Sequence, residues 1–169
     1  KHKRHYIDKK FEKSLLDEML SAANLAPSWK NSQTPRFYVA TGEKSKNAVR
    51  EALPEFNRKN SENASAYIVT TVVLNRSGFY KDGTAVTEIG NGWGYYDLGL
   101  NNMALLLKAT ELGISTLVMG IRDGEKLRKE FDIPETEAVV SVIAVGYTDS
   151  EIVRPKRKSV EDFAKFYED

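Results

Sequence analysis

The segment ANLAPSWKNSQTPRFYVAT, residues 23–41, carries more information than any other stretch of this chain. It begins at the end of an apolar helical pattern, passes through a polar loop, and ends in residues 37–41, which favour a β-strand. The loop combines neutral hydrogen-bonding side chains with a large aromatic one: Pro27, Ser28, Trp29, Asn31, Ser32 and Gln33. Such a set suits a ligand with a flat ring, because polar side chains can bond to its edge and the aromatic side chain can lie near its face. The composition of the loop alone predicts only turns.

Length and composition suit one globular domain. The chain has 169 residues, of which 41% are hydrophobic, and a chain of this size buries about two-thirds of its unfolded surface. We therefore expect a single domain over residues 1–169. The net charge of +1 argues against a dedicated nucleic-acid binder, because that class usually carries a strong basic excess.

Several chemistries and locations are disfavoured by what the sequence lacks. No apolar run approaches the roughly 18 residues of a membrane span and no signal segment opens the sequence, so we expect a cytoplasmic location without membrane contact. Cysteine is absent, which excludes disulfides and Cys-ligated metal. The two histidines, His2 and His5, both lie in the charged segment KHKRH. We expect neither a Ser-His-Asp triad nor a metal site from them.

Phosphate-binding glycine motifs are missing as well. The sequence has no GxxxxGK[ST] segment, and the glycine-rich residues 90–94 lack the third glycine of GxGxxG because Tyr95 stands in its place. A chain poor in nucleophiles and bases can still perform redox chemistry when a bound cofactor carries it.

Hydrophobic patterns predict a mixture of helices and strands. The expected helices span residues 13–25, 44–53, 93–112 and 123–131, with a short one around 160–167. The expected strands span residues 37–41, 66–74, 114–121 and 138–147, while 55–65 are irregular and 75–92 form a loop or lid. Because the last two strands flank only a short helix, we predict an α+β fold: a mixed, largely antiparallel sheet flanked by helices.

The predicted helix 93–112 is unusual because apolar residues surround it almost completely, which indicates burial in a core or a subunit interface. Its amides Asn101 and Asn102 need hydrogen-bond partners there. Asp97, close to its start, is expected to favour the helix dipole or to cap the helix locally. Gly113 fits a C-terminal cap.

Two basic clusters lie near opposite ends of the chain: Lys1, Lys3 and Arg4 at the start, and Arg154, Lys156, Arg157 and Lys158 near the end. Convergent cations of this kind bind phosphate. From spacing alone, two solvated tails remain the simpler interpretation, and contact with nucleic acid is a third one.

Two further groups have both a binding and a structural interpretation. Residues 117–120 offer backbone N–H groups beside Gly120, where a flat ligand can approach closely, but an ordinary strand end explains them equally well. Phe79, Trp93, Tyr95 and Tyr96 surround the glycine-rich stretch and either wall a pocket or belong to the core.

Four blocks of sequence, in this order, resemble the FMN-dependent nitroreductase family. They are KHKRHYID, LAPSWKNSQTPRFYVAT, GYYDLGLNNMALLLKATELGISTLVMGIRD and VVSVIAVGYTDSEIVRPKRKSVEDF. The second block is the most specific, because it is similar to the family's Pro-Ser-x-x-Asn-x-Gln-Pro loop and the strand that follows. In the first block, Arg4 and Tyr6 match the family's recurrent basic and aromatic residues.

The resemblance implies a homodimer with FMN at the subunit interface, each site lined by both chains, and a tail from about residue 150 that packs on the partner subunit. It implies phosphate contacts from Lys1, Lys3, Arg4 and Arg157, and contacts from the loop of the other subunit through Pro27, Ser28, Trp29 and Asn31. The backbone of Val118, Met119 and Gly120 matches the segment that faces the reactive nitrogen of the flavin. Asn57 and Asn60 fall where family members place polar contacts to the ring edge.

The activity implied is transfer of hydride from NADH or NADPH, through FMN, to a small acceptor such as a nitroaromatic, a quinone or a free flavin. Three alternatives stay open: a dehydrogenase or deiodinase-like relative of the same fold, a non-catalytic flavin-binding dimer, and an unrelated α+β domain whose tails bind an acidic partner. The sequence also departs from the family, with His2 in place of a serine, Pro155 in place of a lysine, and no long insertion in 75–92. The acceptor is therefore not defined by the resemblance.

Overall fold

The computed structural model describes residues 5–150 and 155–168. Its strands are β1 (Tyr6–Ile7), β2 (Pro35–Ala40), β3 (Ala66–Val73), β4 (Ser115–Met119) and β5 (Glu137–Thr148). They form a sheet in the order β1-β5-β3-β2, and β4 also pairs with β5. Every strand pair within the described residues is antiparallel, so the predicted mixed character is absent from this part of the chain.

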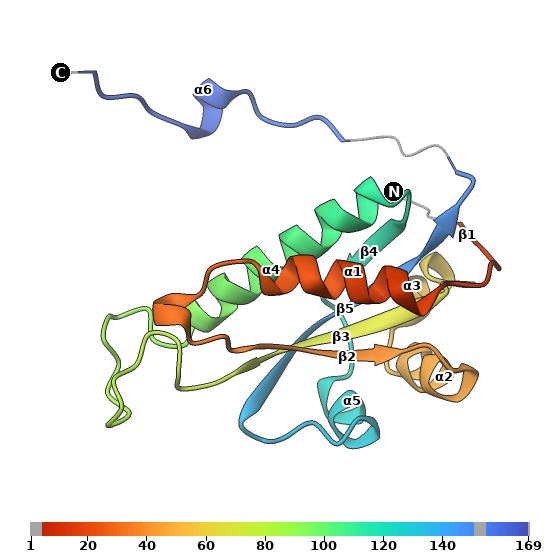
Figure 1. Cartoon of the computed structure of the whole chain (residues 1–169), viewed down its shortest axis with the longest axis horizontal. Coiled ribbons are helices and arrows are strands. Elements are labelled where there is room, and N and C mark those ends of the chain that lie inside the picture. Colours follow the sequence, from red (N-terminus) through yellow and green to blue (C-terminus); the bar gives the residue numbers. More distant parts are fainter. Residues whose placement is uncertain (1–4, 151–154, 169) are drawn as a thin grey trace.

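Helices cover both faces of this sheet, which confirms the α+β class (Figure 1). They are α1 (Lys13–Asn24), α2 (Glu43–Glu51), α3 (Glu55–Asn60), α4 (Gly92–Glu111), α5 (Gly124–Glu130) and α6 (Val160–Phe163), with a 3-10 turn η1 (Trp29–Asn31). Helices α1 and α4 pack on one face, and α2 and α5 lie on the other.

The central strand β3 is buried on both faces, as its continuous run of β-branched residues predicts. Val69 belongs to the core beneath α2 and α5, whereas the next residue back, Ile68, belongs to the core beneath α1 and α4. Successive side chains of a strand point to opposite faces, so one strand supplies both hydrophobic cores. From this central position it fixes the relative placement of the two helical layers.

One local prediction was wrong. Residues 55–65 were expected to be irregular, but Glu55 begins the short helix α3, with Pro54 as its N-cap. Its six residues are too few to show an apolar period, although an acidic residue in the first turn favours a helix start. Helix α1 begins at Lys13 without a side-chain cap, and Lys13 forms an ion pair with Asp17.

Helix α4 is buried on one side only. Leu98, Leu105 and Ala109 pack into the core, while Tyr96, Met103 and Leu107 are 60%, 52% and 59% exposed. The predicted burial all round is therefore incomplete within a single chain. Gly113, which follows the helix, has a φ of 71° and confirms the predicted glycine cap.

The C-terminal segment stands apart from the rest of the chain. In Figure 1, α6 and its flanking residues lie above α4 and are separated from the sheet. Phe163, Phe166 and Tyr167 are exposed there. Packing of this tail on a partner subunit stays a prediction. Within the described ranges, no helix is long and apolar enough to cross a membrane.

A buried carboxylate links three strands at one end of the sheet. Glu137 of β5 accepts hydrogen bonds at Oε2 from the hydroxyls of Tyr38 (2.9 Å) and Thr71 (2.5 Å). Desolvation, followed by the hydrogen bond to Glu137 and its charge, raises the pKa of Tyr38 to about 12. The Tyr38 hydroxyl therefore keeps its proton in the folded chain at pH values where it would lose that proton in the unfolded chain.

We predict that Tyr38→Phe lowers the free energy of unfolding at pH 7 by about 1–3 kcal/mol, because a buried carboxylate loses a donor. The raised pKa means that the folded chain keeps a proton that the unfolded chain releases above its ordinary value of 10.0. The contribution of Tyr38 is thus complete below pH 10 and falls as the pH rises toward 12. Urea unfolding at pH 7, 9 and 11 measures the difference in unfolding free energy between wild type and Tyr38→Phe, which should become smaller above pH 10.

The control is Tyr167→Phe, since Tyr167 is exposed in the tail. It should change the unfolding free energy by less than about 0.5 kcal/mol at every pH. If the difference in unfolding free energy between wild type and Tyr38→Phe stays unchanged from pH 7 to 11, the stabilising contribution does not come from the protonated Tyr38 hydroxyl.

Candidate functional site

The loop between α1 and β2 has a strained backbone. Lys30, Asn31 and Gln33 have φ angles of 45°, 55° and 49°, in the left-handed region. Each such non-glycine residue costs on the order of 1–3 kcal/mol and persists only where its surroundings fix it. Strain of this kind concentrates at functional sites, which makes this loop the first candidate.

Asp97 of α4 holds the loop in place. Its carboxylate is 2% exposed and accepts the backbone N–H of Trp29 at both oxygens, each at 3.1 Å. The hydroxyl of Ser77 donates to the same carboxylate. Ser77 in turn contacts the hydroxyls of Ser32 at 2.5 Å and Thr34 at 3.2 Å. One buried charge therefore orders both the loop and the segment that follows β3.

This role corrects the prediction for Asp97. The first turn of α4 contains no acidic residue, so Asp97 lies beyond the turn where the helix dipole acts most strongly. Its oxygens are used in tertiary hydrogen bonds. The sequence did contain a signal, because an acid within a strongly apolar helix must find partners when it is buried. Asn101, one turn later, donates to the carbonyl of Asp97 at 3.2 Å.

Aromatic side chains pack around the start of this loop. The rings of Trp29 and Trp93 lie 4.8 Å apart between centroids, and those of Trp93 and Tyr96 lie 5.8 Å apart. Trp93 donates its Nε1–H to the hydroxyl of Thr87, whereas the buried Nε1 of Trp29 has no partner within the described residues. Trp93 and Tyr96 of the predicted aromatic zone thus form, together with Trp29, an aromatic wall beside the loop.

The second group of predicted residues gathers at the end of β4. Val118 is 47% exposed, Met119 is buried, and Gly120 is exposed, with no atom within 4 Å of the place a Cβ would take. Asn57 of α3 donates its Nδ2–H to the carbonyl of Ile121 at 3.1 Å. The fold therefore places Asn57 beside residues 118–120, far apart in sequence. Asn60 ends the same helix and is half-buried.

These two groups lie in different places within one chain. The loop leads into β2, and β2 is separated from β4 by β3 and β5, which amounts to three strand spacings or about 14 Å. Figure 1 shows η1 and α3 toward opposite ends of β2. A single chain consequently presents two separate half-sites.

The predicted phosphate contacts are only partly described by the structure. Lys1, Lys3 and Arg4 lie outside the described residues, as does Arg154. Arg157 is exposed and donates to the carbonyl of Pro155. No cluster of three or more His, Cys, Asp or Glu side chains suited to a metal ion occurs within residues 5–150 and 155–168.

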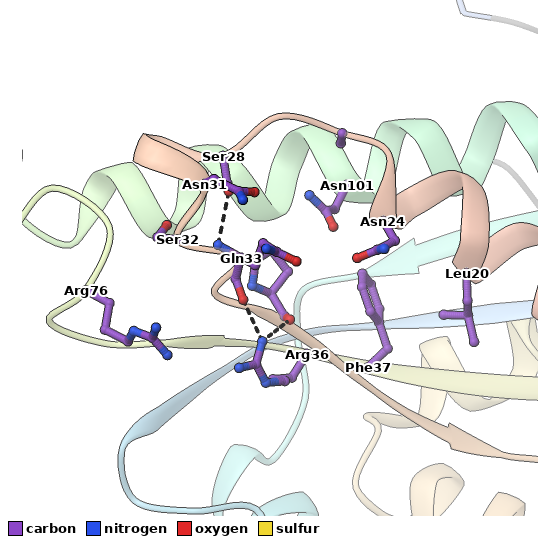
Figure 2. Close-up of a pocket in the computed structure, with 12 residues that line it drawn as sticks. Leu20, Asn24, Ser28, Asn31, Ser32, Gln33, Arg36, Phe37, Arg76 and Asn101 are labelled. Atoms are coloured by element: carbon purple, nitrogen blue, oxygen red, sulfur yellow. Dashed lines mark hydrogen bonds between the residues drawn. The ribbon is translucent and has the colours of Figure 1, made fainter.

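A polar cavity of about 450 Å³ opens beside the loop (Figure 2). Its lining comes from α1, the loop, β2, the segment after β3, and α4: Leu20, Asn24, Ala26, Ser28, Asn31, Ser32, Gln33, Pro35, Arg36, Phe37, Arg76 and Asn101. Ser28 and Asn31 also belong to the predicted flavin contacts. Arg36 and Arg76 were not foreseen, because nothing in the local sequence connects two arginines forty positions apart.

The sequence model of the Nitroreductase family matches residues 2–147. The chain belongs to the nitroreductase family. Membership of this family implies an oxidoreductase, and the resemblance drawn from the four sequence blocks is confirmed. No curated protein matches the sequence.

Solved structures of nitroreductases share this fold over nearly their whole length. A nitroreductase family protein from Streptococcus pneumoniae TIGR4 is 21% identical with a TM-score of 0.81, covering 98% of this chain and 94% of that one. A nitroreductase family protein from Clostridium difficile 630 is 23% identical with a TM-score of 0.75, covering 97% and 94%. An FMN-dependent nitroreductase from Clostridium difficile R20291 is 24% identical with a TM-score of 0.71, covering 96% and 90%.

We predict that Asp97→Asn lowers the free energy of unfolding by about 1.5–3 kcal/mol, because the amide removes the charge that the Trp29 N–H and the Ser77 hydroxyl share. The strained loop should then open more often. Urea unfolding measures the stability, and limited proteolysis between residues 27 and 34 measures the opening.

Asp17→Asn is the matched control, since Asp17 forms only an exposed ion pair with Lys13. It should change stability by less than about 0.5 kcal/mol and leave the cleavage rate unchanged. Equal effects of the two substitutions would show that Asp97 does not hold the loop.

Proposed function

We propose that this chain is an FMN-dependent oxidoreductase, which passes hydride from NADH or NADPH to a small acceptor such as a nitroaromatic or a quinone. The observation that carries the proposal is the strained loop held by Asp97, because it occupies the place of the family's Pro-Ser motif. The FMN-dependent nitroreductase from Clostridium difficile supports the choice of cofactor.

We infer that two copies of the chain complete each flavin site. The loop half-site and the half-site formed by Asn57 and residues 118–120 are too far apart to meet on one ring within one chain. A second copy can bring its loop to the other half-site. A two-fold dimer then contains two equal sites.

The exposed face of α4 supports such a homodimer. Tyr96, Leu100, Met103 and Leu107 recur at helical spacing and form an apolar stripe along it. Within this stripe, a Cβ on Gly99 would have no atom within 4 Å, so the helix backbone is accessible to a partner. Exposed contiguous apolar surface of this kind marks interaction sites. The exposed aromatic residues of the tail offer a second surface for the same partner.

The residues at the two half-sites fit an FMN group. When bound, FMN supplies the hydride chemistry. Gly120 leaves open space for a flat ring, and Val118, two residues before it, is exposed on the same strand end. Asn57 keeps this segment in position through the carbonyl of Ile121.

The loop residues have a different task. Pro27, Ser28, Trp29 and Asn31 would cover the ring from the other subunit, with the aromatic wall limiting access of water. Lys1, Lys3, Arg4 and Arg157 would bind the phosphate group as cations. The nicotinamide would bind first at the free face of the ring, and the acceptor would bind there after the nicotinamide has left. Holding each reactant close to the ring would supply much of the rate of hydride transfer.

The direct test is purification of the protein with added FMN, followed by oxidation of NADH or NADPH in the presence of a quinone. We expect a yellow protein with stoichiometric FMN and steady turnover. Bound flavin without turnover would show a non-catalytic flavin-binding protein instead. Protein that stays colourless after incubation with excess FMN would contradict the proposal altogether.

For the dimer we predict that Met103→Asp shifts the protein toward monomer and lowers FMN affinity by about tenfold or more, because a charge enters a desolvated apolar interface. Asn47→Asp on α2 is the control, since it adds the same charge at an exposed position outside the stripe. Analytical ultracentrifugation and flavin fluorescence titration measure both properties. A monomeric wild-type protein with full FMN affinity would contradict the shared site.

A further inference from the structure

Two arginines without carboxylate partners line the cavity beside the loop. Arg36 comes from β2 and Arg76 from the segment after β3, and both are exposed. Neither arginine forms an ion pair with any residue that the structure describes. None of the twelve lining residues is acidic. The cavity therefore holds two positive charges that nothing in its wall neutralises.

Arg36 is oriented by the backbone of the loop. Its Nη1 donates to the carbonyls of Gln33 at 2.7 Å and Pro35 at 2.8 Å. These bonds leave Nε and Nη2 free to donate elsewhere. Because β2 is the edge strand of the sheet, the side chain can pass around the edge and reach the cavity. Figure 2 shows its guanidinium group directly below Gln33.

Arg76 is fixed at its base and free at its tip. The next residue, Ser77, is buried and bonded to Asp97 and Ser32. The guanidinium group has no hydrogen-bond partner within the described part of the chain and lies on the same side of the cavity as Arg36 (Figure 2). The two arginines can therefore converge on a single ligand.

Amide groups form the opposite wall. Figure 2 shows Asn101 of α4 and Asn24 of α1 across the cavity from the two arginines. Asn101 is buried and donates one amide hydrogen bond to Asp97, which leaves its Oδ1 as an acceptor. A ligand thus meets cations on one side and neutral polar groups on the other.

We propose that this cavity binds a compact oxyanion, a carboxylate or a phosphate, on the molecule that exchanges hydride with the flavin. The proposal rests on the proposed function, because Ser28 and Asn31 belong both to the cavity and to the expected flavin contacts. Guanidinium groups recognise carboxylate and phosphate through paired hydrogen bonds. The same chemistry can come from the 2′-phosphate of NADPH or from an acidic acceptor.

The test compares FMN-loaded wild-type protein with the double variant Arg36→Gln, Arg76→Gln in two arms. The first arm measures KM for NADPH and for NADH with a neutral quinone. The second arm measures KM for 4-nitrobenzoate and for the neutral 4-nitrobenzamide at saturating NADH. We expect KM to rise about tenfold or more for the member of one pair that carries the additional anionic group, NADPH or 4-nitrobenzoate, while the KM of its counterpart without that group changes less than about twofold.

Two further variants protect the test. Lys44→Gln with Lys81→Gln removes two positive charges from exposed positions that do not line the cavity. It should therefore leave the ratio of the two KM values unchanged in each substrate pair. Arg76→Gln alone leaves the hydrogen bonds of Arg36 to the loop intact, so it remains informative if the double variant folds poorly. Equal KM changes for both members of each pair, or a loss of FMN affinity in place of a KM change, would overturn the proposal.

A binding readout separates this proposal from the proposed function. In FMN-loaded protein, in which the flavin phosphate occupies the cations of the two termini, inorganic phosphate should raise the Tm of wild type and of the lysine control, but not that of the double arginine variant. Turnover without charge preference and without this phosphate effect would overturn the anion site alone. A phosphate effect that depends on the two arginines, in a protein that never turns over, would support the anion site and overturn the enzymatic function.

Discussion

The hydrogen bonds from Trp29 and Ser77 to the carboxylate of Asp97 are the constraint on which the candidate site depends. Three residues of the loop have backbone angles in the left-handed region, a conformation that the loop would not keep without the contacts around it. The bidentate contact to the Trp29 N–H and the hydroxyls around Ser77 supply the compensating interactions in a buried, low-dielectric place. The loop is thereby fixed before any ligand arrives, which lowers the entropy lost on binding.

The same helix connects the loop to the proposed dimer. One side of α4 carries Asp97 and the core residues Leu98 and Leu105, and the other side carries the exposed stripe with Met103 and Leu107. Contact with a second copy through the stripe would thus act on the element that positions the loop. In this arrangement dimerisation and flavin binding reinforce each other, because each requires the same geometry of α4.

The sequence predicted those features that depend on local patterns. The run of β-branched residues in β3 identified a strand buried on both faces, and the Pro-Ser loop was found through its motif. What it missed depends on contacts between distant residues. Asp97 reaches Trp29 across 68 positions, and Arg36 and Arg76 line one cavity only because β2 and β3 are neighbours. Helix α3 was missed because it is too short to show a period. Asn57 was suggested by the family resemblance, and only the fold explains how it lies beside Gly120.

The shared site is tested most directly by subunit exchange between two defective variants. Asp97→Asn should disable the loop half-site, and Gly120→Phe should fill the space at the other half-site, so each protein alone should bind FMN poorly. After exchange, half of the dimers contain one intact site, and we expect FMN binding to return to about a quarter of the wild-type sites. A mixture that binds no more FMN than its separate components would contradict a site built from two chains.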